Sequence, residues 1–468
     1  MTSQSGLAAR RRGAGIGLAL ALVSVVGVRH RTGVAEATPA GAATAAPAAT
    51  STSSATAAVD HGDWLRAALA HAAPGATIDV PAGFYQGPFT IDRAVRLRAA
   101  GPAHIYGDGR THTIAVRADD VTLDGFEISG SGLDLTQDHA AVHVSGARAV
   151  IVNNRIHDAL HGIYVRQGEA ARIEGNHITG TRTIEQPVDP LAAAGKPGEG
   201  ELCEVALNQN LRGNGIHIWN ASHHVVARNT IRDTRDGVYF SFVDDSDVRG
   251  NDIEGVRYAV HYMYSDGNRF EDNVFRDNAA GAALMSSNHI VLRRNQFLSN
   301  RGHRSYGLLL QTVDDSTLEA NRIDGNTVGV FIESGHGNRF IDNRIERNHI
   351  GIHVSDSSDA NQFSGNRFVG NLHTVETSGA NAASQWTIDG RGNYWDGAVA
   401  IDLDRNGIAD VPHRELDLFG GLRRDMPTVG LLGGSPAERL LRFVHTRLAL
   451  PGLPGVVDRA PLTGVPQP

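Results

Sequence analysis

Residues 236–278 read DGVYFSFVDDSDVRGNDIEGVRYAVHYMYSDGNRFEDNVFRDN and contain one short pattern twice. Each copy has a Gly or Ala followed by alternating apolar residues, and later an Asn that precedes further apolar residues. Gly237 and Ala259 are 22 residues apart, and so are Asn251 and Asn273. A fixed period of this length is typical of a solenoid, in which each repeat packs on its two neighbours.

The same repeat, called a rung below, extends along most of the chain. Successive asparagines are 22 or 23 residues apart except at two places, where the gaps are 53 and 26 residues. The larger gap marks an insertion over residues 181–211. The anchors are Asn154, Asn176, Asn229, Asn251, Asn273, Asn295, Asn321, Asn343 and Asn366.

The residues around these anchors predict the kind of solenoid. Positions one and three residues after each Gly or Ala are apolar and rich in β-branched side chains, which predicts short strands whose alternate side chains face inward. Asparagine tolerates left-handed turns and can stack in hydrogen-bonded ladders from rung to rung. We therefore expect an all-β fold, a right-handed parallel β-helix with rungs of 22 residues.

Both ends of a solenoid need caps. A short helix is predicted at the N-terminal end, where WLRAALAHA follows Asp63, and one helix in the C-terminal cap, where Ser435 and Glu438 form a capping-box pattern. The centre of the insertion, residues 186–204, is rich in Pro, Gly and Glu and is predicted to be a loop. It holds the sole cysteine, Cys203, so the chain has no internal disulfide, and acidic neighbours favour a plain surface thiol over a copper thiolate.

The N-terminal residues have the composition of an export signal. Three arginines at positions 10–12 precede an apolar run at 13–28, and the small-residue cleavage pattern AEA follows at 35–37. This order predicts a periplasmic protein with a cleaved signal peptide, and an uncleaved N-terminal anchor is the alternative. The predicted layout is a signal peptide (1–37), a flexible Ala/Thr/Ser/Pro linker (38–59), the parallel β-helix (60–380) and a C-terminal cap region (381–468).

The charge of the chain excludes one class of partner. There are 43 Lys and Arg residues against 51 Asp and Glu residues, which gives a net charge of −8. This is the wrong sign for a nucleic-acid binder. The sequence also contains no P-loop, so we do not expect this chain to hydrolyse ATP itself.

Two outward-facing columns, two and four residues after each Gly or Ala, are rich in His, Met and aromatic residues. Met263 and Met285 are one rung apart, and His261 lies two residues before Met263 on the same face. Two thioethers and an imidazole suit transiently bound Cu(I) better than Ca²⁺ or Mg²⁺. His217, two rungs and about 9–10 Å away, would need a different or a moved copper ion. The alternative is a plain protein-binding surface, since Met and aromatic residues are enriched at interfaces.

A second motif, DLDRNGIAD at residues 402–410, resembles the first part of a calcium-binding loop. Asp402, Asp404, Asn406 and Asp410 stand where such a loop has oxygen ligands, so calcium is a second candidate ion. The twelfth position is His413 rather than the usual glutamate, which weakens the closure of a calcium site. The alternative is a well-formed turn that joins the last rung to the C-terminal cap.

Several stretches of the sequence resemble the NosD family of periplasmic maturation proteins of nitrous oxide reductase. In the rungs the matching stretches are LRGNGIHIWN (211–220), DTRDGVYF (233–240), VRYAVHYMYSDGNRFEDNVFRDN (256–278) and YGLLLQTVDDSTLEANRIDGN (306–326). Beyond them they are GNYWDG (392–397), DLDRNGIADVPHR (402–414), DLFGGL (417–422) and PGVVDRAPL (454–462).

The resemblance implies a non-enzymatic partner of an ABC transporter. In that picture the β-helix stands on the transporter's membrane subunit, whose ATPase is a separate chain, and takes copper from a copper-chaperone lipoprotein. It then helps to build the copper–sulfide centre of nitrous oxide reductase. His261 and Met263 fall inside the stretch HYMYS that matches the family. The long insertion and the long linker depart from the family pattern.

Two other classes of function remain open at this stage. β-Helices also serve as polysaccharide lyases, epimerases and hydrolases, and fold alone does not fix function. Such enzymes need a base and charge-neutralising groups along the outer groove, and the Asp-Pro-His-Asp motif of mannuronan epimerases is absent here. The third class is a structural adaptor, for which the aromatic outer face suffices without metal.

Overall fold

The computed structural model describes residues 59–187, 202–206, 208–302, 304–377, 384–416 and 455–464, together with the single positions 426, 428, 435, 436 and 440. The predicted signal peptide, nearly all of the predicted linker and most of the helix predicted after Ser435 lie outside these described residues. Within them, no helix combines the length and the apolar character that crossing a membrane requires.

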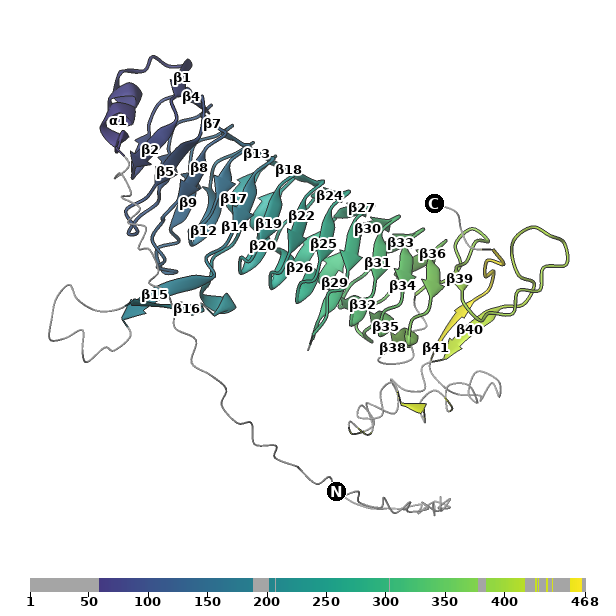
Figure 1. Cartoon of the computed structure of the whole chain (residues 1–468). Helices are drawn as coiled ribbons and strands as arrows, with labels where there is room; N and C mark the ends of the chain where they lie inside the picture. Colours follow the sequence, from purple (N-terminus) through teal and green to yellow (C-terminus); the bar gives the residue numbers. More distant parts are fainter. Residues whose placement is uncertain are drawn as a thin grey trace, which may run out of the picture. The chain divides into compact units, whose positions relative to one another are not determined.

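The chain winds through three long parallel sheets, contributing one strand to each sheet per rung until the last turn, which adds only β39 (Tyr394–Trp395) to the second sheet (Figure 1). The first sheet contains β1 (Ala76–Val80), β4 (Val95–Ala99), β7 (Thr122–Asp124), β10 (Val150–Val152), β13 (Arg172–Glu174), β18 (Val225–Ala227), β21 (Asp247–Arg249), β24 (Arg269–Glu271), β27 (Val291–Arg293), β30 (Thr317–Glu319), β33 (Arg339–Ile341) and β36 (Gln362–Ser364).

The second sheet contains β2 (Gly83–Gln86), β5 (Ala103–Tyr106), β8 (Glu127–Ser129), β11 (Arg155–Ile156), β14 (His177–Thr179), β19 (Thr230–Arg232), β22 (Asp252–Glu254), β25 (Val274–Arg276), β28 (Gln296–Leu298), β31 (Arg322–Asp324), β34 (Arg344–Glu346), β37 (Arg367–Val369) and β39 (Tyr394–Trp395). The third contains β3 (Phe89–Ile91), β6 (Ile114–Val116), β9 (Ala140–Val144), β12 (His161–Arg166), β17 (Ile216–Ser222), β20 (Asp236–Asp244), β23 (Tyr258–Met263), β26 (Ala280–Asn288), β29 (Tyr306–Asp314), β32 (Val328–Glu333), β35 (Ile350–Val354) and β38 (His373–Thr377). This confirms the predicted all-β, right-handed parallel β-helix.

The alternation of side chains in the third sheet follows the prediction. Val260 and Tyr262, one and three residues after Ala259, are fully buried between the sheets, whereas His261 between them is only partly buried. The recurring glycine has a steric cause. A Cβ atom at Gly237 would lie 2.5 Å from Cγ2 of Ile253 and 2.6 Å from the carbonyl oxygen of Ala259, so the rungs pack closely only if this position stays small.

The predicted asparagine ladder is present and buried. Each side-chain Nδ2 donates to Oδ1 of the asparagine in the next rung at 2.8–3.1 Å. The left-handed residue is the one before the asparagine, for example Asp272 with φ 55° before Asn273, rather than the asparagine itself as expected. The asparagine ladder comprises Asn154, Asn176, Asn229, Asn251, Asn273, Asn295, Asn321, Asn343, Asn366 and Asn393.

The N-terminal cap is the predicted helix, α1 (Gly62–His71), which buries Leu65. Asp63 lies in its first turn and not at its N-cap, which is His61. At the other end, β40 (His413–Leu416) and β41 (Gly455–Asp458) pair antiparallel beside the last rung. The buried carboxylate of Asp458 accepts hydrogen bonds from the backbone N–H of Asn393 at 2.6 Å and from Nε1 of Trp395 at 2.8 Å.

The insertion differs in part from the prediction. Its two ends form an antiparallel hairpin, β15 (Thr183–Pro187) and β16 (Leu202–Ala206), followed by a short 3₁₀ helix, η1 (Gln209–Leu211). The residues predicted to form a loop therefore begin and end in strands, because paired backbone groups satisfy their hydrogen bonds better than an open loop does. Cys203 lies in β16 opposite Gln186.

Candidate copper site

The predicted copper ligands lie on the outer face of the third sheet, on two neighbouring strands. Met263 on β23 and Met285 on β26 are register partners, so their side chains leave the sheet one rung apart. His261 is two residues before Met263 on β23, and its register partner on β26 is Ala283. The sequence therefore placed these three residues correctly with respect to one another.

His261 is held by a buried carboxylate. Its Nδ1 lies 3.0 Å from Oδ2 of Asp236, which is fully buried at the start of β20. Asp236 also receives two hydrogen bonds from Arg257, at 2.8 and 2.7 Å. Burial acts to raise the pKa of the Asp236 carboxyl, but the hydrogen bonds and charges of His261 and Arg257 outweigh it, and the pKa lies below its ordinary value.

This pairing fixes the chemistry that the imidazole can offer. A histidine that ligates a metal commonly donates its other ring N–H to a carboxylate, which sets the tautomer and the ring orientation. With Nδ1 committed to Asp236, Nε2 of His261 is the nitrogen left for a metal ion. The donor set on this face is then one oriented imidazole and two thioethers. Such neutral, soft donors fit Cu(I) better than a hard divalent ion.

Two exposed aromatic residues flank the methionines. Phe242 lies near the end of β20 and Tyr264 directly follows β23. They are 51% and 52% exposed and stack with ring centroids 5.2 Å apart. Both adopt left-handed backbone conformations, with φ of 56° and 51°, which bulky residues rarely adopt. Tyr264 is adjacent in sequence to Met263, so an apolar surface adjoins the thioethers.

His217 is not brought to His261. Tyr239 stands between them in the register, and its ring lies 4.6 Å from the ring of His217 and 4.8 Å from that of His261. On its other side His217 stacks on Tyr164 at 4.4 Å. Burial lowers the pKa of His217 to about 3, and its Nδ1 has no hydrogen-bond partner among the described residues. It is therefore a neutral imidazole with a free nitrogen, two rungs from His261 and Met263 and three rungs from Met285.

The predicted calcium residues form a turn that closes on itself. Asp402 accepts hydrogen bonds from the backbone N–H groups of Asn406 at 3.1 Å and Gly407 at 2.9 Å. Asp404 accepts from the side chain of Asn406 at 2.9 Å, and Asp410 accepts from the N–H of Leu403 at 2.7 Å.

The twelfth position of this motif does not complete an oxygen site. His413 belongs to β40, and its ring lies 4.8 Å from that of Trp395. These contacts are those of the turn proposed as the alternative, and calcium binding stays a prediction.

Sequence reasoning missed Asp236. It occupies the position immediately before Gly237, a position that was not assigned to either outward column. The contact is diagonal between rungs. Asp236 comes just before the Gly237 anchor of its rung, and His261 comes two residues after the Ala259 anchor of the next rung. His161 and His217 repeat this relation, with ring centroids 5.2 Å apart. A column of His161, Asn214, Asp236 and Tyr258 in the sequence was the available signal.

The fold and this face define a parallel β-helix protein that presents two thioethers and a carboxylate-oriented imidazole on one outer surface. Residues 200–399 match the family described as "Periplasmic copper-binding protein (NosD)". A Stutzerimonas stutzeri protein named "Probable ABC transporter binding protein NosD" is 32% identical over 404 residues, which are 83% of this chain and 86% of that protein. The chain belongs to the NosD family, which is periplasmic and copper-binding.

A second relative agrees with this assignment, and a solved structure shares the fold. A Pseudomonas aeruginosa protein of the same name is 31% identical over 401 residues, covering 82% of this chain and 87% of that protein. Among solved structures, the family 28 exopolygalacturonase of Yersinia enterocolitica matches with a TM-score of 0.52 at 12% identity, covering 73% of this chain and 77% of the enzyme. At this identity the likeness shows the shared β-helix fold alone.

Proposed function

We propose that this chain is a non-enzymatic periplasmic accessory protein that receives Cu(I) and passes it on for assembly of the copper–sulfide centre of nitrous oxide reductase. In this proposal copper is cargo, and its ligands are His261, Met263 and Met285. The observation that carries the proposal is the pairing of His261 with buried Asp236 beside two methionines in register. This is a donor set for a soft ion on the face of a protein whose family is copper-binding.

The openness of the site supports transfer rather than storage. His261, Met263 and Met285 are all partly exposed, so a partner can reach the ion from outside. Three neutral ligands leave the charge of Cu(I) uncompensated at the site itself, which favours an exchangeable ion. His217 is proposed as part of a second, separate copper-binding position, because the ring of Tyr239 lies between His217 and His261.

The proposed partners are an ABC transporter, through its membrane subunit and its ATPase, a copper-chaperone lipoprotein that delivers the ion, and nitrous oxide reductase. The names of the relatives support the transporter, since both are called probable ABC transporter binding proteins. The exposed pair of Phe242 and Tyr264 supports a protein contact next to the methionines, because exposed aromatic residues are enriched at interfaces. The layout of signal peptide, linker, β-helix and cap given above belongs to the same proposal.

The test replaces both methionines. Met263→Leu/Met285→Leu keeps volume and apolarity, so the fold should be retained within about 1–2 kcal/mol. Cu(I) affinity is measured by competition with a chromogenic chelator. Loss of a residue that only orients a metal ligand typically lowers affinity by roughly 10–100-fold, so loss of two ligands should lower it by more. Met426→Leu is the matched control, because Met426 is exposed and lies outside the rungs.

Two outcomes would contradict the proposal. Equal Cu(I) affinity in the double variant and the parent would mean that this face is an interface and that the ion binds elsewhere. Cleavage or epimerisation of uronate polymers by the metal-free protein would favour the alternative, a carbohydrate-active β-helix enzyme.

In cells, the expected result is that reductase maturation fails with the double variant and is retained with Met426→Leu.

A further inference from the structure

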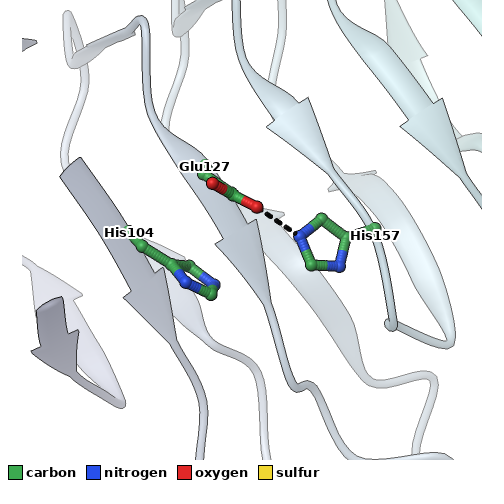
Figure 2. A group of neighbouring side chains, drawn as sticks. All are labelled: His104, Glu127 and His157. Carbon is green, nitrogen blue, oxygen red and sulfur yellow. Dashed lines mark hydrogen bonds and ion pairs between the residues drawn. The ribbon is translucent and has the colours of Figure 1, made fainter. Parts of the chain in front are cut away.

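A second cluster of metal-ligating side chains lies on the second sheet, far along the sequence from the candidate copper residues. It consists of His104 on β5, Glu127 on β8 and His157, which directly follows β11. His104 and Glu127 are register partners on neighbouring strands. One ligand atom from each of the three side chains lies within 4.8 Å of the others, and Figure 2 shows the three side chains facing one another across adjacent strands.

The cluster is held in place by its surroundings. Nδ1 of His157 lies 2.7 Å from Oδ2 of Asp158, and its Nε2 lies 2.8 Å from Oε1 of Glu127. Nε2 of His104 lies 2.8 Å from Oγ of Ser129, which is buried and lies on the same strand as Glu127. The three side chains are all partly buried, and regular strands position two of them. Little reorganisation would be needed to bring them onto one ion.

The donors are of a different kind from those of the copper face. Two imidazole nitrogens and one carboxylate oxygen suit Zn²⁺ and similar divalent ions, whereas they lack the thioether that favours Cu(I). Three protein ligands leave the fourth tetrahedral position of Zn²⁺ for water. Asp158 stands at the other ring nitrogen of His157, where a carboxylate orients a metal-bound histidine. We propose that His104, Glu127 and His157 form a Zn²⁺-binding site, with Asp158 as the residue that orients His157.

The competing explanation for this cluster is an ion pair that needs no metal. His157, when protonated, would bridge Glu127 and Asp158 as a simple ion pair, and His104 would bond only to Ser129. Arg155, which is the register partner of Glu127 on β11, adds a positive charge beside the carboxylate. The two explanations differ in what the chelator-treated protein does with added Zn²⁺, because an ion pair has no need of the ion.

The experiment titrates Zn²⁺ into the full-length, chelator-treated protein by calorimetry, in the background of Met263→Leu/Met285→Leu as well as in the parent. One equivalent of Zn²⁺ should bind in both. Asp158→Asn removes only the carboxylate that orients His157 and should lower the Zn²⁺ affinity by roughly 10–100-fold. Glu127→Gln removes a ligand and should lower the Zn²⁺ affinity by at least as much. His177→Gln is the matched control, because His177 is exposed in the same outer column of the second sheet and should leave the affinity unchanged.

Two further readouts make the test decisive. Co²⁺ in place of Zn²⁺ should give the visible absorption of a four-coordinate ion in the parent and not in Glu127→Gln. Circular dichroism checks that Glu127→Gln is folded, which we expect because the amide oxygen can still accept a hydrogen bond from His157. Failure of the parent to bind one equivalent of Zn²⁺, or equal affinities in the parent and Glu127→Gln, would overturn the site and leave the ion pair as the explanation.

Discussion

Replacing Asp236 with Asn tests both the packing and the proposed copper chemistry of the third sheet. The carboxylate has no solvent exposure, and it accepts two hydrogen bonds from Arg257 and one from His261. Breaking a buried ion pair by removing one partner costs about 3–5 kcal/mol, because the other charge is left uncompensated. The side chain of Arg257 is 32% exposed and can turn partly to water, so we expect the lower end, about 3 kcal/mol.

Asp252→Asn is the matched comparison. Asp252 also pairs with two side chains, Arg232 and Arg276, each at 2.8 Å, but it is 38% exposed. Exposed pairs are screened by water and typically contribute about 0.2–1 kcal/mol, so this change should cost about 1 kcal/mol or less. The free energy of unfolding of each variant is measured by urea titration, with an unchanged slope as the check that the unfolded states are comparable.

The same variant should also affect copper. Asn at position 236 keeps the size of the side chain but removes the charge that orients His261, so Cu(I) affinity should fall by about 10–100-fold. Asp252→Asn should leave copper binding unchanged, because Asp252 belongs to the second sheet. Equal destabilisation by the two substitutions, or a loss below about 1 kcal/mol for Asp236→Asn, would refute the reasoning about the buried network.

The other predictions concern the rungs, the pH response and the N-terminus. Asn273→Ala should cost about 3 kcal/mol or more in a urea titration, since it removes the partners of buried amide groups in both neighbouring rungs. Val260→Asp should cost about 4 kcal/mol or more and His261→Gln about 1 kcal/mol, and similar costs would mean that the assigned strand register is wrong. Because the pKa of His217 is lowered to about 3 in the folded state, the unfolded state binds its proton first as the pH falls below about 6.5. Stability should therefore decline from that pH towards about 3, and the decline between neutral pH and about pH 5 should be smaller in His217→Gln. N-terminal sequencing of the exported protein should find a start near Thr38, and a chain that begins at residue 1 would favour the anchor.

The fold was predictable from the sequence wherever the repeat is regular. The spacing of the asparagines gave the rung, and the apolar residues around Ala259 gave the side of the sheet that each residue faces. The relative placement of His261, Met263 and Met285 followed from that register, and the structure pairs Met263 with Met285 as predicted.

The second cluster was not predictable, and the reason lies in one position. Phe126 occupies the place in its rung that Asn154 occupies in the next, so the anchor that marks later rungs is missing here. Without it, His104 and Glu127 could not be aligned with His157 from sequence alone. The network around Asp236 was missed for a different reason. It depends on a diagonal contact between rungs, which a reading of columns along a single face does not include.

The asparagine ladder gives the β-helix a direction. Each amide passes its donor towards the C-terminal end, so the dipoles of successive side chains point the same way, as peptide dipoles do in a helix. The last amide of the row, Asn393, donates its Nδ2 to the carbonyl oxygen of Trp386 at 2.9 Å and to the carboxylate of Asp458 at 3.3 Å. The same carboxylate accepts from the backbone N–H of Asn393, so a negative charge lies at the positive end of the row. A rung could be added or removed within the row without changing this balance, because every internal amide receives and donates alike. Loss of the segment that carries Asp458 would instead remove the negative charge at the positive end of the row and the acceptor of the Asn393 N–H. The β-helix should therefore tolerate a change in the number of rungs better than the loss of this final strand.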